Sequence, residues 1–263
     1  MANPYSHGDF SWVDLNSKNM MEARDFYASV FGWHCVDQDT QGGPPYSIFE
    51  LDGKQVAGMG QMSPEMIDQG VPSVWNNYVQ VSNCETVCAK CEELGGAVFM
   101  PSMKVLDAGT MAFLQDPHGA MFAVWEADQH FGSEIKDEMN SFCWNELATR
   151  DFDGAKSFYG GLFGWSFEAN PDSPAQYNFI LNGEAQNGGI MLMDENWGDV
   201  PPNWTVYFKV ANVDESAEKI KSHGGQICHG PFDGSPTLRI AICGDLHGGM
   251  FNLIQFKQEN ASG

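Results

Sequence analysis

The chain has 263 residues, of which 43% are hydrophobic and 13% aromatic, so it can bury a sizeable core and is not intrinsically disordered. Its 35 acidic and 13 basic residues give a net charge of −22. Such a surface disfavours nucleic acids and anionic membranes as partners, and it either keeps the protein soluble or attracts cationic ligands.

The N-terminal segment, MANPYSHGDFSW, lacks the basic and apolar regions of a secretory signal. No apolar run is long enough to span a bilayer, so we expect no membrane partner. The seven cysteines, an odd number, then indicate free thiols in a reducing compartment. We therefore expect a cytoplasmic protein.

The first half reads as two modules with one order of elements. In the first module an amphipathic helix over residues 19–31 ends at Gly32, and alternating or short apolar runs predict strands at 10–15, 46–51 and 55–60. In the second module a helix over 84–94 stops at Gly95, and strands are predicted at 76–81, 111–116 and 121–126. Each module is thus predicted as βαβββ, and these runs account for three of its four strands.

The second half of the chain repeats the first. At an offset of 132 residues, positions of the first module recur as Phe142, Trp144, Leu147, Ala155, Phe158, Tyr159, Phe163, Gly164 and Trp165. At an offset of 129, positions of the second recur as Trp204, Tyr207, Val210, Asn212, Lys219, Gly224, Gly225, Asp245, His247, Gly248, Met250 and Phe251. The halves meet in the polar stretch 130–140, so we predict two domains, residues 1–133 and 134–263.

Three motifs in this register resemble the vicinal oxygen chelate superfamily, which includes glyoxalase I, extradiol dioxygenases and bleomycin-resistance proteins. They are the A-x-x-FY-x-x-x-FGW helix from Ala23 to Trp33, the helix followed by Gly-Gly, and the D-P-x-G-x-x-F turn from Asp116 to Phe122. The resemblance implies an α+β fold in which tandem βαβββ modules curl mixed sheets into ligand-holding clefts. It leaves open whether adjacent modules pair, or the first with the fourth and the second with the third.

Members of this superfamily use His and Glu from the strands to hold a divalent metal that acts as a Lewis acid. The matching positions here carry Trp12, Asn76, Ala123 and the pair 57–58 in the first half, and Trp144, Thr205, Asn252 and the pair 188–189 in the second. Indole, methyl and glycine cannot ligate a metal, and neutral oxygens are poor sole ligands. We expect no metal and no cofactor, although a one-residue slip in register would change the face of every strand.

An indole and an acid share one strand face in each half, because Asp14 follows Trp12 by two residues and Glu146 follows Trp144. Together they suit a cationic or aromatic ligand, and the alternative is that the indoles only fill the core. The candidate ligand-binding residues are Trp12, Asp14, Asn76, Tyr78, Trp125, Trp144, Glu146, Thr205, Tyr207 and Asn252.

Two other groups of residues receive structural interpretations. Cys84, Cys88 and Cys91 share a helix face, but the second half has apolar Val213, Ala217 and Ile220 there, so the cysteines are predicted to be core. His118 and His247 occupy equivalent turns and are predicted to be solvated.

Three functions remain open. The first is a metal-free protein, monomer or homodimer, that binds an aromatic or cationic small molecule. The second is an enzyme of lyase, isomerase or dioxygenase type. It would either depend on a metal with displaced ligands or use Asp14 or Glu146 as a general base. Desolvation beside an indole would raise the pKa of such a carboxyl group, which suits that role. The third is a structural protein whose clefts are filled by its own tryptophans.

Overall fold

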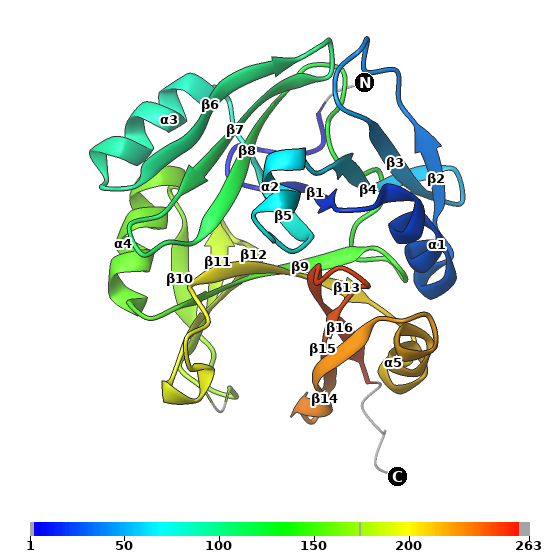
Figure 1. Cartoon of the computed structure of the whole chain (residues 1–263). Coiled ribbons are helices and arrows are strands. Elements are labelled where there is room, and N and C mark those ends of the chain that lie inside the picture. Colours follow the sequence, from blue (N-terminus) through cyan, green and yellow to red (C-terminus); the bar gives the residue numbers. More distant parts are fainter. Residues whose placement is uncertain (1–2, 174, 258–263) are drawn as a thin grey trace. The chain divides into compact units, whose positions relative to one another are not determined.

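The computed structural model describes residues 3–173 and 175–257, and it confirms four βαβββ modules (Figure 1). The first two are β1 (Phe10–Ser17), α1 (Met20–Phe31), β2 (His34–Asp37), β3 (Tyr46–Leu51), β4 (Lys54–Gln61), and β5 (Val74–Gln80), α3 (Cys84–Glu93), β6 (Ala97–Val105), β7 (Gly109–Gln115), β8 (Met121–Ala127). The last two are β9 (Phe142–Thr149), α4 (Phe152–Phe163), β10 (Ser166–Ala169), β11 (Tyr177–Asn182), β12 (Ala185–Leu192), and β13 (Asn203–Lys209), α5 (Val213–Ser222), β14 (Gln226–Ser235), β15 (Leu238–Gly244), β16 (Met250–Phe256). Short helices α2 (Pro64–Asp68) and η1 (Glu195–Trp197) precede the second and fourth modules.

The strands form two mixed sheets of eight strands each, which confirms the predicted α+β class. Their orders are β2-β3-β4-β1-β5-β8-β7-β6 and β10-β11-β12-β9-β13-β16-β15-β14. The first strand of a module pairs in parallel with its last strand, as Asp14 does with Gly58 and Glu146 with Gly189. The other strands of a module pair antiparallel, so both orientations occur in each sheet.

The long helix of the first module begins and ends where its sequence dictates. The Asn19 side chain accepts hydrogen bonds from the backbone of Met21 and Glu22, and Gly32 ends the helix at a φ of 74°. In the third module Asp151 and Gly164 do the same for α4. The predicted helix limits are confirmed within one residue.

The contacts divide the chain into two compact units, each built from one module of either half. Of the described residues, the first unit comprises 3–12, 76–132 and 144–205, and the second comprises 13–75, 133–143 and 206–257. Within the units the second module therefore joins the third and the first joins the fourth. The division into domains 1–133 and 134–263 follows the sequence repeat and stays a prediction.

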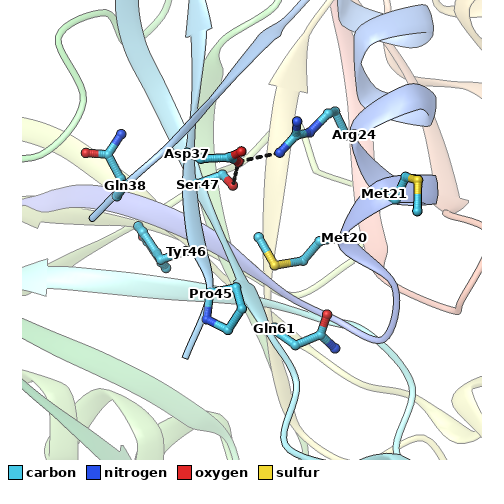
Figure 2. Close-up of a pocket in the computed structure, with 9 residues that line it drawn as sticks. All are labelled: Met20, Met21, Arg24, Asp37, Gln38, Pro45, Tyr46, Ser47 and Gln61. Carbon is cyan, nitrogen blue, oxygen red and sulfur yellow. Dashed lines mark hydrogen bonds and ion pairs between the residues drawn. The ribbon is translucent and has the colours of Figure 1, made fainter. Parts of the chain in front are cut away.

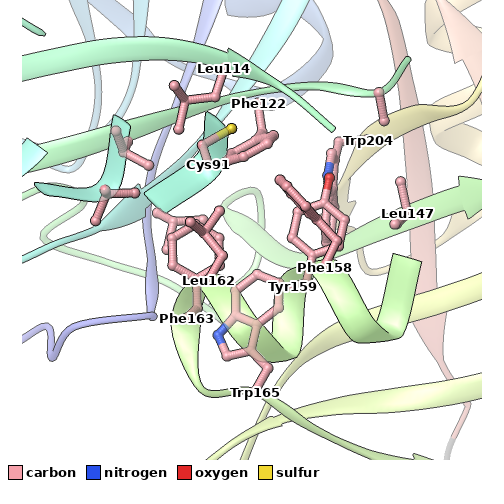
Figure 3. Close-up of a cluster of buried hydrophobic side chains, with 14 of the residues drawn as sticks. Cys91, Leu114, Phe122, Leu147, Phe158, Tyr159, Leu162, Phe163, Trp165 and Trp204 are labelled. Atoms are coloured by element: carbon pink, nitrogen blue, oxygen red, sulfur yellow. The ribbon is translucent and has the colours of Figure 1, made fainter. Parts of the chain in front are cut away.

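The core of the first unit packs α3 and strands of the second module against α4 (Figure 3). At its centre the Tyr159 ring stacks on Trp165, with centroids 5.7 Å apart, and meets Trp204 edge-on at 5.4 Å. Cys84, Cys88 and Cys91 are buried in the same core, which confirms their predicted role. Burial raises the pKa of Cys84 and Cys91 to about 12, so these thiols stay protonated and unreactive.

A chain of three buried polar groups ties helix to turn in this core. The Trp204 indole donates to the Tyr159 hydroxyl at 2.8 Å, which donates to Asp116 at 3.1 Å. Asp116 also accepts the backbone N–H groups of His118 and Ala120, both at 2.9 Å. In the second unit Trp75, Tyr27 and Asp245 repeat this arrangement. The FY pair and the turn aspartate of the sequence motifs are thus partners in folding.

The turn histidines contact the same helices. His118 Nε2 lies 3.9 Å from Asp151 Oδ2, and His247 Nε2 lies 2.7 Å from Glu22 Oε2. Their side chains are only 22% and 25% exposed. Both histidines lie in turns, as predicted, but each imidazole is only partly exposed, because it lies against an acid at the N-terminal end of a helix.

In the described part of the chain, no helix combines the length and apolar character needed to cross a membrane.

Candidate functional site

Strand β9 brings two of the predicted residues to one point in the first unit. The Trp144 indole donates a hydrogen bond to the Tyr177 hydroxyl at 2.9 Å. The same hydroxyl is hydrogen-bonded to Glu146, whose residue exposure is only 9%. The predicted indole and acid therefore meet through a tyrosine, and we call Trp144, Glu146 and Tyr177 the β9 cluster.

A glycine opposite Glu146 makes room for this tyrosine. Gly189 pairs with Glu146 in the register of β9 and β12. A Cβ added at Gly189 would lie 1.8 Å from the Tyr177 hydroxyl oxygen and 3.0 Å from the Trp144 indole nitrogen. Only a residue without a side chain lets the phenol reach across the strand. The Phe179 ring, 6.1 Å from that of Trp144 and edge-on, extends the aromatic surface.

The electrostatics of the cluster follow from burial. Burial, and then the negative charge of Glu146, raises the pKa of the Tyr177 phenol, while the Trp144 hydrogen bond opposes the rise. The phenol therefore remains a neutral donor to the carboxylate. A carboxylate held among aromatic rings suits a positively charged group on a flat ligand. Trp144 is partly exposed, so part of this residue remains accessible from outside the cluster.

The first repeat carries the same pair in the second unit. The Tyr46 hydroxyl donates to Asp14 Oδ2 at 3.3 Å, and a Cβ added at Gly58 would lie 2.0 Å from that hydroxyl. Asp14 is buried, with 8% of its surface exposed. The acid, the tyrosine and the glycine thus recur in the first repeat.

Tyr46 also borders a cavity of about 490 Å³ (Figure 2). Its lining residues are Met20, Met21, Arg24, Asp37, Gln38, Pro45, Tyr46, Ser47 and Gln61. The Arg24 guanidinium forms an ion pair with Asp37, and Ser47 donates to the same carboxylate at 2.7 Å. The Ser47 hydrogen bond, followed by the Arg24 charge, lowers the pKa of Asp37. The opposite charges of Arg24 and Asp37 therefore neutralise each other in this cavity.

The other predicted residues lie elsewhere. Trp12 and Trp125 are buried around His130, and Tyr78 meets the Phe113 ring edge-on at 5.9 Å. Asn76 and Thr205 are half-buried, and the Thr205 hydroxyl donates to Asn203 at 2.9 Å.

Tyr207 and Asn252, both buried, face each other in the parallel register of the second unit. The Asn252 side-chain oxygen has no hydrogen-bond partner among the described residues. Among the ten predicted residues, hydrogen bonds join Trp144 and Glu146 through Tyr177. Their joint role in binding stays a prediction.

Sequence reasoning missed Tyr46, Tyr177 and His130. A signal for the tyrosines exists, because Tyr46 and Tyr177 recur at an offset of 131, between the two offsets used to align the repeats. His130 has no such signal, since it lies in the stretch that reads as a linker.

The residues at the metal positions of such folds do not fit a divalent ion. The strand positions carry Trp12, Asn76 and Ala123 in one repeat and Trp144, Thr205 and Asn252 in the other. Across residues 3–173 and 175–257, no three His, Cys, Asp or Glu residues lie close enough together to hold a metal ion. Neutral oxygens without His or carboxylate partners bind such ions weakly.

Comparison with known proteins supports the fold and its repeat. Residues 9–124 and 140–253 match the family model described as Glyoxalase/Bleomycin resistance protein/Dioxygenase superfamily. A Mycobacterium bovis protein named "Putative glyoxylase CFP32" is 35% identical over 253 residues, covering 95% of this chain and 96% of that protein. "Anthracycline biosynthesis protein DnrV" of Streptomyces peucetius is 29% identical over 265 residues, covering 97% of this chain and 95% of that protein.

Solved structures agree. The Mn(II)-bound glyoxalase from Novosphingobium aromaticivorans superposes with a TM-score of 0.64 at 15% identity, covering 96% of this chain and 83% of that one. The 2,3-dioxygenase LapB from Pseudomonas sp. KL28 gives a TM-score of 0.64 at 11% identity, covering 98% and 96%. At such identities the likeness shows the fold alone, and it confirms the fold that the sequence motifs predict.

Proposed function

Because the chain belongs to the glyoxalase/bleomycin resistance protein/dioxygenase superfamily, we propose that it binds a flat aromatic small molecule with a positive group, without a metal ion, at the β9 cluster. One observation carries the proposal: a buried carboxylate, hydrogen-bonded by Tyr177, lies beside a partly exposed indole that shares the same tyrosine. The indole offers a stacking face and the carboxylate offers a charge partner.

The names of relatives support an aromatic ligand. Two Streptomyces relatives are named for anthracycline biosynthesis, and anthracyclines are built on fused aromatic rings. The net charge of −22 favours the approach of cations over anions. In this proposal the protein acts in the cytoplasm as a monomer or homodimer.

Replacing Trp144 with Ala is expected to weaken the binding of proflavine, a flat cationic dye, about 10-fold, because the stacking face is lost (~1.4 kcal/mol). Glu146→Gln is expected to weaken proflavine similarly while leaving anthraquinone-2-sulfonate, a flat anion, unchanged or tighter. Isothermal titration calorimetry measures both affinities, with Trp197→Ala on η1 as the matched control. Proflavine affinity that survives Trp144→Ala, or absence of binding by the intact chain, would overturn the proposal.

A second function is favoured by the buried carboxylates of both repeats and by the relative named as a glyoxylase. Glu146, or Asp14 in the first repeat, would then be a general base for proton transfer. Turnover by EDTA-treated protein of the hemithioacetal formed from methylglyoxal and glutathione, lost in Glu146→Gln, would support the enzyme. Ligand binding without turnover supports the binding protein.

A further inference from the structure

In the first repeat one imidazole contacts two tryptophans. The His130 ring meets the Trp12 indole edge-on, with centroids 4.5 Å apart and planes at 85°. It meets the Trp125 indole at 5.9 Å and 70°. Both indoles are nearly buried, at 4% and 6% exposure, while His130 is half-buried. Trp12 and Trp125, two of the predicted ligand-binding residues, thus already contact a flat nitrogen heterocycle. This heterocycle is the imidazole of the chain's own His130.

The backbone fixes this histidine in place. The N–H groups of Asp128 and His130 both bond to the Ala108 carbonyl, at 2.9 and 3.1 Å, which anchors the segment to the turn between β6 and β7. The Trp125 indole donates to the His130 carbonyl at 2.8 Å. Two residues later the chain passes so close to Ser11 that a Cβ at Gly132, whose φ is +119°, would lie 2.3 Å from the Ser11 carbonyl oxygen. The placement of the ring is therefore a built feature and not the position of a loose linker.

The second repeat does not provide this arrangement. Trp12 corresponds to Trp144, which is partly exposed and donates a hydrogen bond to Tyr177. At the offset of 129 residues Trp125 corresponds to Ile254, so the second indole is missing. The counterpart of His130, residue 259, lies outside the described residues. The two repeats have thus diverged at the positions that would contact a flat ligand.

We propose that Trp12 and Trp125 form a second binding site for a flat nitrogen heterocycle, and that its resident occupant is the chain's own His130. The expected stoichiometry of binding rests on the proposed function. Because His130 fills this second site, one chain binds one external ligand, at the β9 cluster. Removal of the imidazole leaves a space between two indoles that free imidazole fills.

His130→Gly tests the proposal with imidazole as the probe. The variant is expected to melt at a lower temperature than the wild type, and imidazole is expected to raise that temperature and shift tryptophan emission with saturation. At ten times its Kd, imidazole raises the folding constant about 11-fold. Wild-type protein and His34→Gly, which removes an exposed histidine from β2, are expected to show no saturable response.

Two further variants keep the test decisive. His130→Phe retains a flat ring between the indoles, so it is expected to melt near the wild type and ignore imidazole. If His130→Gly does not fold, His130→Ala is titrated in its place. Absence of an imidazole response in a folded His130→Gly or His130→Ala protein, or an equal response in His34→Gly, would overturn the proposal.

The outcome is separable from that of the proposed function. Imidazole rescue of His130→Gly needs no ligand at the β9 cluster and survives if proflavine fails to bind. Conversely, calorimetry could find two proflavine molecules bound to the wild-type chain and only one bound to Trp12→Ala. This result would contradict the proposal that His130 fills the second site, and it would leave the proposed binding at Trp144 intact.

Discussion

Expressed separately, residues 1–133 and residues 134–263 are expected to remain unfolded or to aggregate, and mixing them is expected to restore a cooperative thermal transition. Each compact unit takes one module from either half. In the first unit Phe122 packs on Tyr159 at 5.4 Å, and in the second Phe31 packs on Phe208 at 5.1 Å. Either half alone therefore exposes one side of both cores.

The stabilisation lost when the halves are separated is expected to exceed the free energy of unfolding of a domain of this size. Each large apolar side chain removed from its core costs about 1.5–3 kcal/mol, and several such side chains lie on each side of both cores. A domain of this size is stable by only about 5–15 kcal/mol.

Circular dichroism and differential scanning calorimetry of the halves, alone and mixed, measure whether each sample folds and melts cooperatively. A chain cut by a protease at a site inserted within 134–140 serves as the control, and it is expected to stay folded. Independent cooperative melting of either half would show that 1–133 and 134–263 are domains that fold alone.

Asp116→Ala is expected to lower the free energy of unfolding by about 3–5 kcal/mol, the largest effect of any single substitution considered for this chain. The change leaves three donors without their acceptor: the backbone N–H groups of His118 and Ala120, and the Tyr159 hydroxyl. Asp116 is 3% exposed, so water cannot replace it freely. Tyr159→Phe, which deprives the Trp204 indole of its acceptor, is expected to cost about 1–3 kcal/mol.

Urea unfolding of the Asp116 variants measures this difference. Asp153→Ala, on the exposed surface of α4, is the matched control and is expected to change the free energy of unfolding by less than about 0.5 kcal/mol. Asp116→Asn keeps one oxygen for the turn and is expected to lose less than Asp116→Ala. Equal stability of Asp116→Ala and Asp153→Ala would show that the buried chain of polar groups does not hold the turn to α4.

The modules and their order were readable because helix and strand periodicity and glycine stops are local signals, and the repeat supplied each signal twice. Pairing between modules was not readable, because the partner of an apolar helix face depends on contacts far apart in the sequence. The D-P-x-G turn is an instance: its aspartate was recognised as a motif, but its partner Tyr159 lies 43 residues away.

The candidate site was readable only in part. Trp144 and Glu146 were found because strand alternation puts them on one face. Tyr177 was missed because the loop before β11 is one residue shorter than the loop before β3, which moves the repeat offset from 132 to 131. His130 was missed because a polar stretch without periodicity gives no sign of where its side chains point.

The most direct test of ligand binding at the β9 cluster is fluorine NMR of protein in which the eight tryptophans are replaced by 5-fluorotryptophan. Single Trp→Phe variants assign the resonances, and proflavine is then added. We expect the Trp144 resonance to shift with saturation while those of Trp12 and Trp125, enclosed around His130, stay in place. A shift of Trp12 or Trp125 with Trp144 unmoved, or no shift of any resonance, would contradict the account.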